Sequence, residues 1–170
     1  REDIMSNPVS DLVAGFQDLV SQVPDLVQPL IVALAGAVPF IEGEGAAAIG
    51  IIGGIHPVVA ALAGAAGNFL CVAIVVLATA RVRTAVTTRA GAAEKPVSAR
   101  SEKFQKAYHR YGTPGVSLLG PLILPTQFTA AALKGTGVPT RTVLFWQGLA
   151  IVLWTTLVTL IITGVIAAAG

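Results

Sequence analysis

Two long stretches of this sequence contain almost no charged side chains, and they restrict the possible folds more than any other feature. Residues 26–80 carry two carboxylates and residues 111–170 carry two basic side chains, apart from a histidine in the first stretch. Only 12% of the whole sequence is charged, where a soluble domain has about 25%. Apolar stretches longer than about 18 residues are typical of membrane spans. We therefore expect an all-α integral membrane protein.

The first half of the chain, residues 1–83, divides into an amphipathic helix, a broken apolar segment and a clean span. Over residues 8–23 apolar side chains recur at helical spacing opposite aspartates and glutamines, which is typical of a helix lying in the membrane interface. Residues 26–56 are apolar but interrupted by proline, glycine and two glutamates, whereas residues 58–80 have the length and composition of one transmembrane helix.

A basic linker, residues 84–100, leads to a second half with the same order of elements. Residues 101–111 predict another amphipathic helix, and residues 113–140 another apolar segment broken by proline and glycine. Residues 143–168 predict a second clean span, which completes the second repeat, residues 101–170.

The length of the broken segments favours re-entrant helical hairpins, which enter and leave the membrane by the same face. Each segment has about 30 residues, whereas two full spans need about 40. Irregular backbone at membrane depth is tolerated only where protein or a wet cavity covers it. Four plain spans remain the alternative.

An internal repeat relates the two halves. At an offset of 82 residues, Pro39 falls on Pro121 and Pro57 falls on Pro139. Repeats with broken segments at matching positions are the sequence signature of a transporter site near the membrane midplane. We expect an inverted repeat of amphipathic helix, re-entrant hairpin and transmembrane helix. The alternative is two similar apolar hairpins whose likeness has no functional role.

The basic residues predict the orientation of the chain. Basic side chains in a short loop mark the cytoplasmic side, so we expect the loop 81–110 to be cytoplasmic in a multi-pass membrane protein. With two re-entrant hairpins both termini would lie outside, and with four plain spans both would lie inside.

Glu42 and Glu44 are the strongest candidates for a functional site, because a carboxylate inside a membrane segment costs several kcal/mol. Residues two apart on a helix point about 200° from each other, so both share one site only if Gly43 and Gly45 let the stretch unwind. Two close buried carboxylates could bind and release a proton near neutral pH. The alternative is a short interfacial loop with solvated acids.

Uncharged polar residues extend this candidate substrate- or proton-binding site. Thr126 and Gln127 take the positions that the repeat aligns with Glu44 and Gly45, and Asn68 lies on the first clean span. Their hydrogen-bond donors could satisfy a carboxylate or a substrate hydroxyl. The alternative is that Thr126 and Gln127 are ordinary polar residues at a helix end and that Asn68 forms a hydrogen bond between helices. The residues expected to act as structural hinges are Pro39, Gly43, Gly45, Pro121 and Pro125.

The second amphipathic helix carries Lys103, Lys106 and Arg110, which we expect to hold anionic lipid headgroups or to act only as a topology signal. Membrane lipids and a small-molecule or lipid substrate are the expected partners, together with a second copy in a homodimer, whereas nucleic acid is not expected. No metal-ligand cluster, phosphate loop or catalytic triad is visible. We therefore expect no cofactor and no enzymatic activity.

Several short motifs resemble the family of small multidrug export proteins. They are the runs AVPFIEGEG at residues 37–45, YGTPGVSLLGP at residues 111–121 and LPTQF at residues 124–128, together with Pro57 and the Gly-Asn pair at residues 67–68. The resemblance covers most of the chain.

That family is distantly similar to the DedA membrane proteins, which have paired re-entrant helices and a membrane-embedded acidic residue. The resemblance implies a bacterial plasma-membrane location and proton-linked transport or lipid scrambling, with Glu42 and Glu44 at the acidic position. DedA proteins carry an arginine beside the second-half proline, but residues 120–127 have none, so the likeness does not extend to phosphate recognition.

The residues and the resemblance together predict a small membrane transporter or lipid translocase, with proton coupling as an option. Its site would lie at the midplane between the two broken segments. The alternative is a membrane-embedded structural protein that binds a partner and transports nothing.

Overall fold

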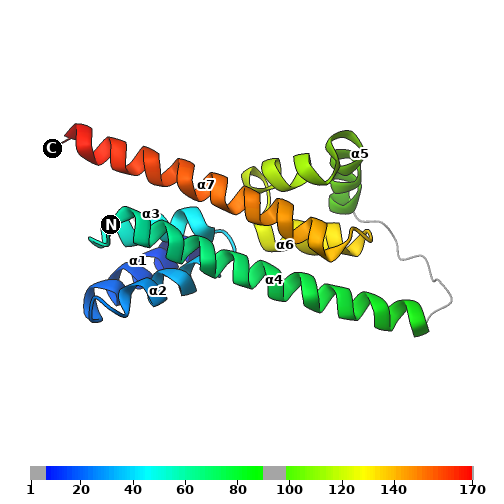
Figure 1. Ribbon diagram of the computed structural model, residues 1–170, viewed down its shortest axis with the longest axis horizontal. Helices are drawn as coiled ribbons and strands as arrows, with labels where there is room; N and C mark the ends of the chain where they lie inside the picture. The colour runs from blue at the N-terminus through cyan, green and yellow to red at the C-terminus, as the bar shows by residue number, and fades with distance from the viewer. Residues whose placement is uncertain (1–6, 90–98, 170) are drawn as a thin grey trace, which may run out of the picture. The chain divides into compact units, whose positions relative to one another are not determined.

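The computed structural model describes residues 7–89 and 99–169, and every regular element within these ranges is a helix. The prediction of an all-α chain is therefore confirmed for the described residues. The elements are α1 (Pro8–Gln22), α2 (Gln28–Gly36), α3 (Glu42–Ile52), α4 (Pro57–Arg89), α5 (Ala99–Leu119), the short 3-10 helix η1 (Gly120–Leu122), α6 (Thr126–Gly135) and α7 (Thr140–Ala169) (Figure 1).

The chain folds into two compact units. The first unit contains residues 1–70 and 151–170, and the second contains residues 71–150. The long helices α4 and α7 each contribute one part to both units. The first unit adds α1, α2 and α3 to these parts, and the second unit adds α5, η1 and α6.

The core of the first unit is built mainly from α1, α2 and α3. Asn7 caps α1 because its side chain accepts a hydrogen bond from Val9 N at 3.1 Å. Two residues of the apolar face of α1 reach the core: Val20 is fully buried, and Phe16 packs against the buried residues. The buried members of this core are Val20, Val32, Ala35, Ile41, Ala46, Ile49, Ile51, Ile55 and Ala60.

Glycines let α2 approach α4 very closely in this unit. A side chain at Gly67 of α4 would overlap the carbonyl of Ala33 on α2, and a side chain at Gly36 of α2 would overlap the carbonyl of Gly64 on α4. Small residues at a helix contact allow the two backbones to touch. The packing of this unit therefore depends on the absence of side chains at these positions.

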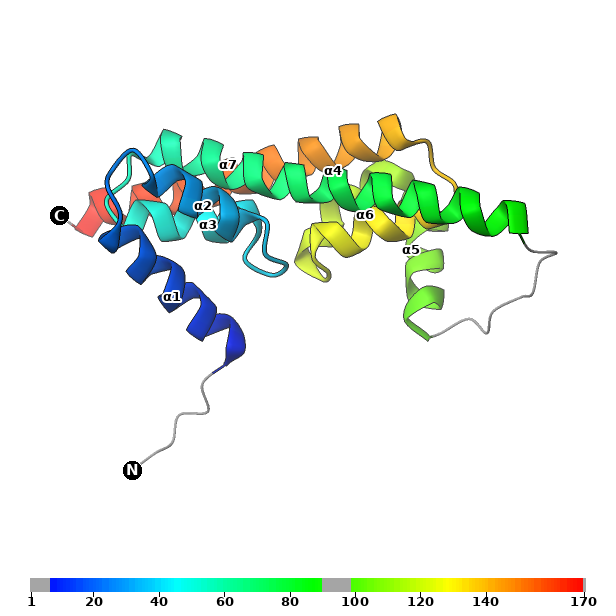
Figure 2. The ribbon, with the colours of Figure 1, turned by 90° about the horizontal axis from the view of Figure 1, so that it is seen from below.

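A tight turn joins α2 to α3, and the two helices lie side by side (Figures 1 and 2). The backbone nitrogens of Ile41 and Glu42 both donate to the Val38 carbonyl, at 3.2 and 3.1 Å. Phe40 and Glu42 have φ angles of +73° and +56°, in a left-handed region that is uncommon for such side chains. Residues 28–52 thus form a helical hairpin with a strained turn.

In the second unit, α5 consists of two helical segments that meet at a sharp bend (Figure 2). The bend lies at Gly112, whose φ of +65° and ψ of −171° are open to glycine but not to other residues. Pro114 follows, in the first turn of the second segment, where its missing N–H costs no hydrogen bond. The segment expected to be broken from residue 113 onward is therefore helical as far as Leu119.

The first long helix also extends beyond the predicted span. We expected a linker over residues 84–100, but α4 continues to Arg89. No proline or glycine interrupts residues 81–89, and Thr84 Oγ1 bonds back to the Ala80 carbonyl at 3.0 Å. Residues 90–98 of this linker lie outside the described residues.

The turns that lead into the two long helices have the same hydrogen-bond pattern. After α3, Gly54 has a φ of +90° and Ile55 N donates to the Gly50 carbonyl at 2.9 Å. After α6, Gly137 has a φ of +101° and Val138 N donates to the Leu133 carbonyl at 3.3 Å. A left-handed glycine with this long backbone bond is the Schellman cap of a helix. The matching residues are 83 positions apart (137 − 54), one more than the offset found from the prolines.

Two helices are long and apolar enough to cross a membrane. They cover 29 residues of α4, Pro57–Ala85, and 30 residues of α7, Thr140–Ala169, and at 1.5 Å per residue each is about 44 Å long. Only 28% and 22% of their most apolar stretches are buried within the chain. The exposed large apolar side chains on them include Leu62, Leu70, Ile74, Val152, Leu160 and Ile161.

Candidate functional site

Glu42 is a buried carboxylate on a strained backbone. Its side chain is only 3% exposed, and it stands at the first residue of α3, directly after the turn of the hairpin. A left-handed φ in a residue with a long side chain is rare, and such conformations cluster at functional sites. Burial of a carboxylate is costly as well, so two unfavourable features coincide at this residue.

Glu44 has different surroundings from Glu42. The Gly45 nitrogen donates to the Ile41 carbonyl at 3.0 Å, so the stretch is the first turn of a helix and is not unwound. Glu42 is buried, whereas Glu44 is only half-buried. Burial still raises the pKa of the Glu44 carboxyl above its ordinary value, partly offset by a hydrogen bond from the backbone.

Two threonines of α7 bring further polar groups into the first unit. Thr155 Oγ1 packs directly against Gly43, next to Glu42 in the chain, so any side chain at Gly43 would collide with it. Thr155 and Thr159 are 2% and 9% exposed, and within the described residues neither hydroxyl oxygen has a hydrogen-bond partner. Buried hydroxyls without partners are unusual, so these two threonines form an uncommon polar position on an apolar helix.

Neither threonine was predicted from the sequence as a site residue. They lie four residues apart, so they share one face of an otherwise apolar helix. That spacing was the available signal, but threonine is common in apolar helices, where its hydroxyl can bond to its own backbone. Thr163 does this, donating to the Thr159 carbonyl at 2.8 Å. Asn68, the site residue expected on α4, is fully buried in the same unit.

The expected partners of the carboxylates belong to the second unit. Thr126 and Gln127 begin α6, are 1% and 4% exposed, and form a hydrogen bond of 3.4 Å between Thr126 Oγ1 and Gln127 Oε1. By the offset of the matched turns, 83 residues, Gln127 corresponds to Glu44 and Thr126 to Gly43. The prolines, at an offset of 82, place Thr126 on Glu44 instead.

A second pair of buried polar groups connects α5 to α7 within the second unit. Gln147 Nε2 donates to Ser117 Oγ at 3.4 Å, and both residues are fully buried. The remaining Gln147 oxygen has no partner within the described residues, and the same is true of the hydroxyl of Thr129 on α6. Both units thus contain buried uncharged polar groups, and the first unit contains a buried carboxylate as well.

The expected hinge residues have different roles. Pro39 lies in the turn between α2 and α3, Pro121 lies in η1, and Pro125 precedes the first residue of α6. Gly43 and Gly45 lie in the first turn of α3. Gly43 is required for another reason, because it leaves room for Thr155 and for the backbone of α4.

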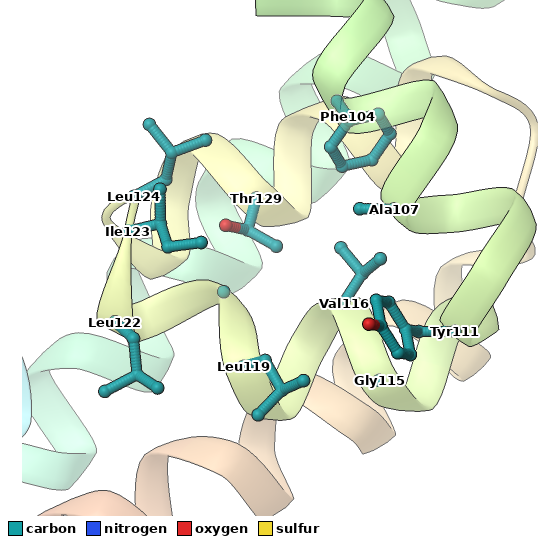
Figure 3. A pocket seen from close by; sticks show the side chains of 11 residues that line it. Phe104, Ala107, Tyr111, Gly115, Val116, Leu119, Leu122, Ile123, Leu124 and Thr129 are labelled. Carbon is teal, nitrogen blue, oxygen red and sulfur yellow. The ribbon is translucent and has the colours of Figure 1, made fainter.

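The basic residues of α5 lie beside an apolar cavity. Lys106 and Arg110 are exposed, and the Arg110 guanidinium carbon lies 5.3 Å from the centre of the Tyr111 ring. The side chain of Lys103, the third expected headgroup ligand, lies outside the described residues. Tyr111 is one wall of a cavity of about 730 Å³ (Figure 3). The cavity is lined by Phe104, Ala107, Tyr111, Gly115, Val116, Leu119, Gly120, Leu122, Ile123, Leu124 and Thr129.

Residues 7–89 and 99–169 contain no group of three or more His, Cys, Asp or Glu side chains that could hold a metal ion. Comparison of the chain with protein-family models, with curated proteins and with solved structures finds no match.

Proposed function

We propose that this chain is an integral membrane protein in which α4 and α7 are the transmembrane helices. The support is their exposure together with their composition. Each is about 44 Å long, enough to cross a hydrocarbon layer of about 30 Å, and most of its apolar side chains are not covered by the chain. A soluble core helix of this composition would be buried, because a patch of exposed apolar surface this large is unfavourable in water.

The helical hairpin α2–α3 and its counterpart around α6 would be the re-entrant elements of an inverted repeat. The support is the identical capping turn that follows α3 and α6, with the same left-handed glycine and the same backbone bond. Inverted repeats place broken helices at the membrane midplane, where they bind substrates and coupling ions.

We propose further that the protein is a small transporter or lipid translocase, and that Glu42 is its proton-binding group. One observation carries this proposal: Glu42 combines burial with a strained backbone at the start of a short helix. A buried carboxylate is most easily tolerated when it can take up a proton and become neutral. The hydroxyl of Thr155, packed on the next residue, adds a donor and an acceptor nearby.

A reconstitution experiment tests this function. The purified protein is placed in liposomes that contain the pH dye pyranine and a trace of fluorescent phosphatidylethanolamine, so that proton flux and lipid scrambling are read together. We expect the wild type to show proton flux, lipid scrambling or both, at a rate that depends on pH. In Glu42→Gln both rates should fall to the level of protein-free liposomes.

Glu102→Gln is the matched control, because Glu102 is an exposed glutamate on α5, and it should behave as wild type. Equal activity in Glu42→Gln and the wild type would reject Glu42 as the proton-binding group. If neither activity exceeds that of protein-free liposomes, the chain is not a translocase of these species, and the partner-binding alternative gains support.

Sided labelling tests the inverted repeat. In a Cys71→Ala background, Ser10→Cys on α1 and Gln105→Cys on α5 place thiols at exposed positions. Re-entrant hairpins put α1 and α5 on opposite sides of the membrane, so an impermeant maleimide applied to intact cells should label only Ser10→Cys. Labelling of both thiols, or of neither, would favour four plain spans.

A further inference from the structure

We propose that the cavity of the second unit binds the acyl chain of an anionic phospholipid, and that Arg110 holds the phosphate of that lipid. The inference rests on the membrane location proposed above and is independent of transport.

The cavity has the size and the surface of a site for a hydrocarbon chain. Its volume of about 730 Å³ falls within the range of about 300 to 1,000 Å³ that is usual for ligand sites. Figure 3 shows its walls, with Phe104 and Tyr111 on one side and Ile123 and Leu124 on the other. Apart from the hydroxyls of Tyr111 and Thr129, the side chains that line it are apolar.

The backbone keeps the cavity open. The bend at Gly112 sets the two segments of α5 at an angle to each other, and both segments contribute walls of the cavity. Gly120 holds η1 against α6, because a Cβ at Gly120 would lie 3.0 Å from Thr129 Oγ1. Leu119, Leu122 and Ile123 remain 47%, 63% and 82% exposed. A cavity with so much uncovered apolar surface is favourable only if a hydrocarbon fills and covers it.

Charge complementarity indicates the headgroup. Arg110 lies over the ring of Tyr111, which is itself a wall of the cavity, so the guanidinium stands at the edge of the apolar surface. Lys106 lies one helical turn earlier on the same face of α5 and is also exposed. A guanidinium binds phosphate through two parallel hydrogen bonds. A soluble anion could pair with the same two basic side chains, but it would leave the apolar walls of the cavity uncovered.

Lipid retention by the full-length protein tests the proposal. The protein is purified in a mild detergent with equal amounts of phosphatidylglycerol and phosphatidylcholine of identical acyl chains, and bound lipid is measured by native mass spectrometry. We expect phosphatidylglycerol to be retained preferentially. Arg110→Gln should reduce this preference about five-fold, the effect of one basic residue near a lipid surface.

Variants of the cavity test the acyl-chain site separately. Ala107→Trp and Leu119→Trp fill the cavity from two different helical segments, and each should abolish retention of both lipids in folded protein. Arg141→Gln is the matched control, because Arg141 is an exposed arginine outside the cavity, and it should leave retention unchanged.

Two outcomes would overturn the proposal. Wild-type retention in the folded cavity-filling variants would show that the lipid binds elsewhere, and an unchanged preference in Arg110→Gln would remove the headgroup assignment. Glu42 lies in the first unit and is not among the residues that line the cavity. A failed transport assay with normal lipid retention would therefore reject only the transport proposal, and the reverse result would reject only the lipid site.

Discussion

The helices α3 and α6 end in the same capping turn, yet they begin in different ways. α3 begins with a buried carboxylate at Glu42, in the left-handed region, after a tight helical turn. α6 begins with Thr126 and Gln127, which are buried but uncharged, after Pro125 in an extended conformation. The two short helices therefore share the turn that joins each of them to its long helix, and they differ in the charge of their first buried side chains.

The surroundings of the two helices differ as well. In the first unit α1 closes over the end of α3, where Val20 would contact any side chain at Gly53. In the second unit Arg83 covers the end of α6, donating to the carbonyls of Lys134 and Gly135 at 3.3 Å each. The first unit is packed through glycines, whereas the second contains an open cavity. Similar backbone turns thus occur beside a closely packed region with a buried carboxylate in the first unit and beside an open apolar cavity in the second.

The largest expected effect tests the dense packing of the first unit. Gly67→Ala places a methyl group against the Ala33 carbonyl and should lower the free energy of unfolding by about 1–3 kcal/mol, the usual cost of overpacking. Gly135→Ala in the second unit is the matched control, because nothing lies within contact of a side chain there. Thermal unfolding in detergent measures both. Equal melting temperatures would contradict the close approach of α2 and α4.

A pH-dependent effect of intermediate size tests the carboxylates. Because burial raises the pKa of Glu44, the folded state binds its proton more tightly than the unfolded state does. The associated stability is fully present below the ordinary pKa of a glutamate and is lost as the pH rises through the raised value. Glu44→Gln should therefore flatten the fall in melting temperature as the pH is raised above 4.5, the ordinary pKa of a glutamate.

The corresponding position in the second unit supplies the reverse experiment. Gln127 is buried and uncharged, so Gln127→Glu should introduce a fall in stability with rising pH that the wild-type residue cannot cause. Melting temperatures across the same pH range would show it. A Gln127→Glu protein with the pH profile of the wild type would mean that this position is not shielded from water.

The smallest expected effect concerns the cap of α6. Arg83→Gln removes a cation from the carbonyl end of that helix and should lower stability by about 0.5 kcal/mol, because helix-end charges at exposed sites are weak. Arg81→Gln removes a neighbouring exposed arginine and serves as the control. A difference of less than about 0.2 kcal/mol between the two variants in chemical unfolding would show that the Arg83 contact is not stabilising.

Several residues of the candidate site could be predicted from the sequence, but their arrangement in space could not. Glu42 was identified because a carboxylate in an apolar segment is conspicuous in any sequence. The closed helical turn at Glu44, with its bond from the Gly45 nitrogen to the Ile41 carbonyl, was not predicted, because glycines allow either a helical or an unwound backbone. Thr155 was missed because its partner, Gly43, lies far away in the sequence.

Periodicity and apolar length by themselves determined that the chain is helical and that two of its helices are long enough to cross a membrane. These properties are local, since each depends on side chains a few residues apart along one helix. The tertiary structure alone decided which glycines serve as contact surfaces, which carboxylate is buried and where a cavity opens. Those features arise where segments distant in sequence meet, and spacing along the chain carries no information about such contacts.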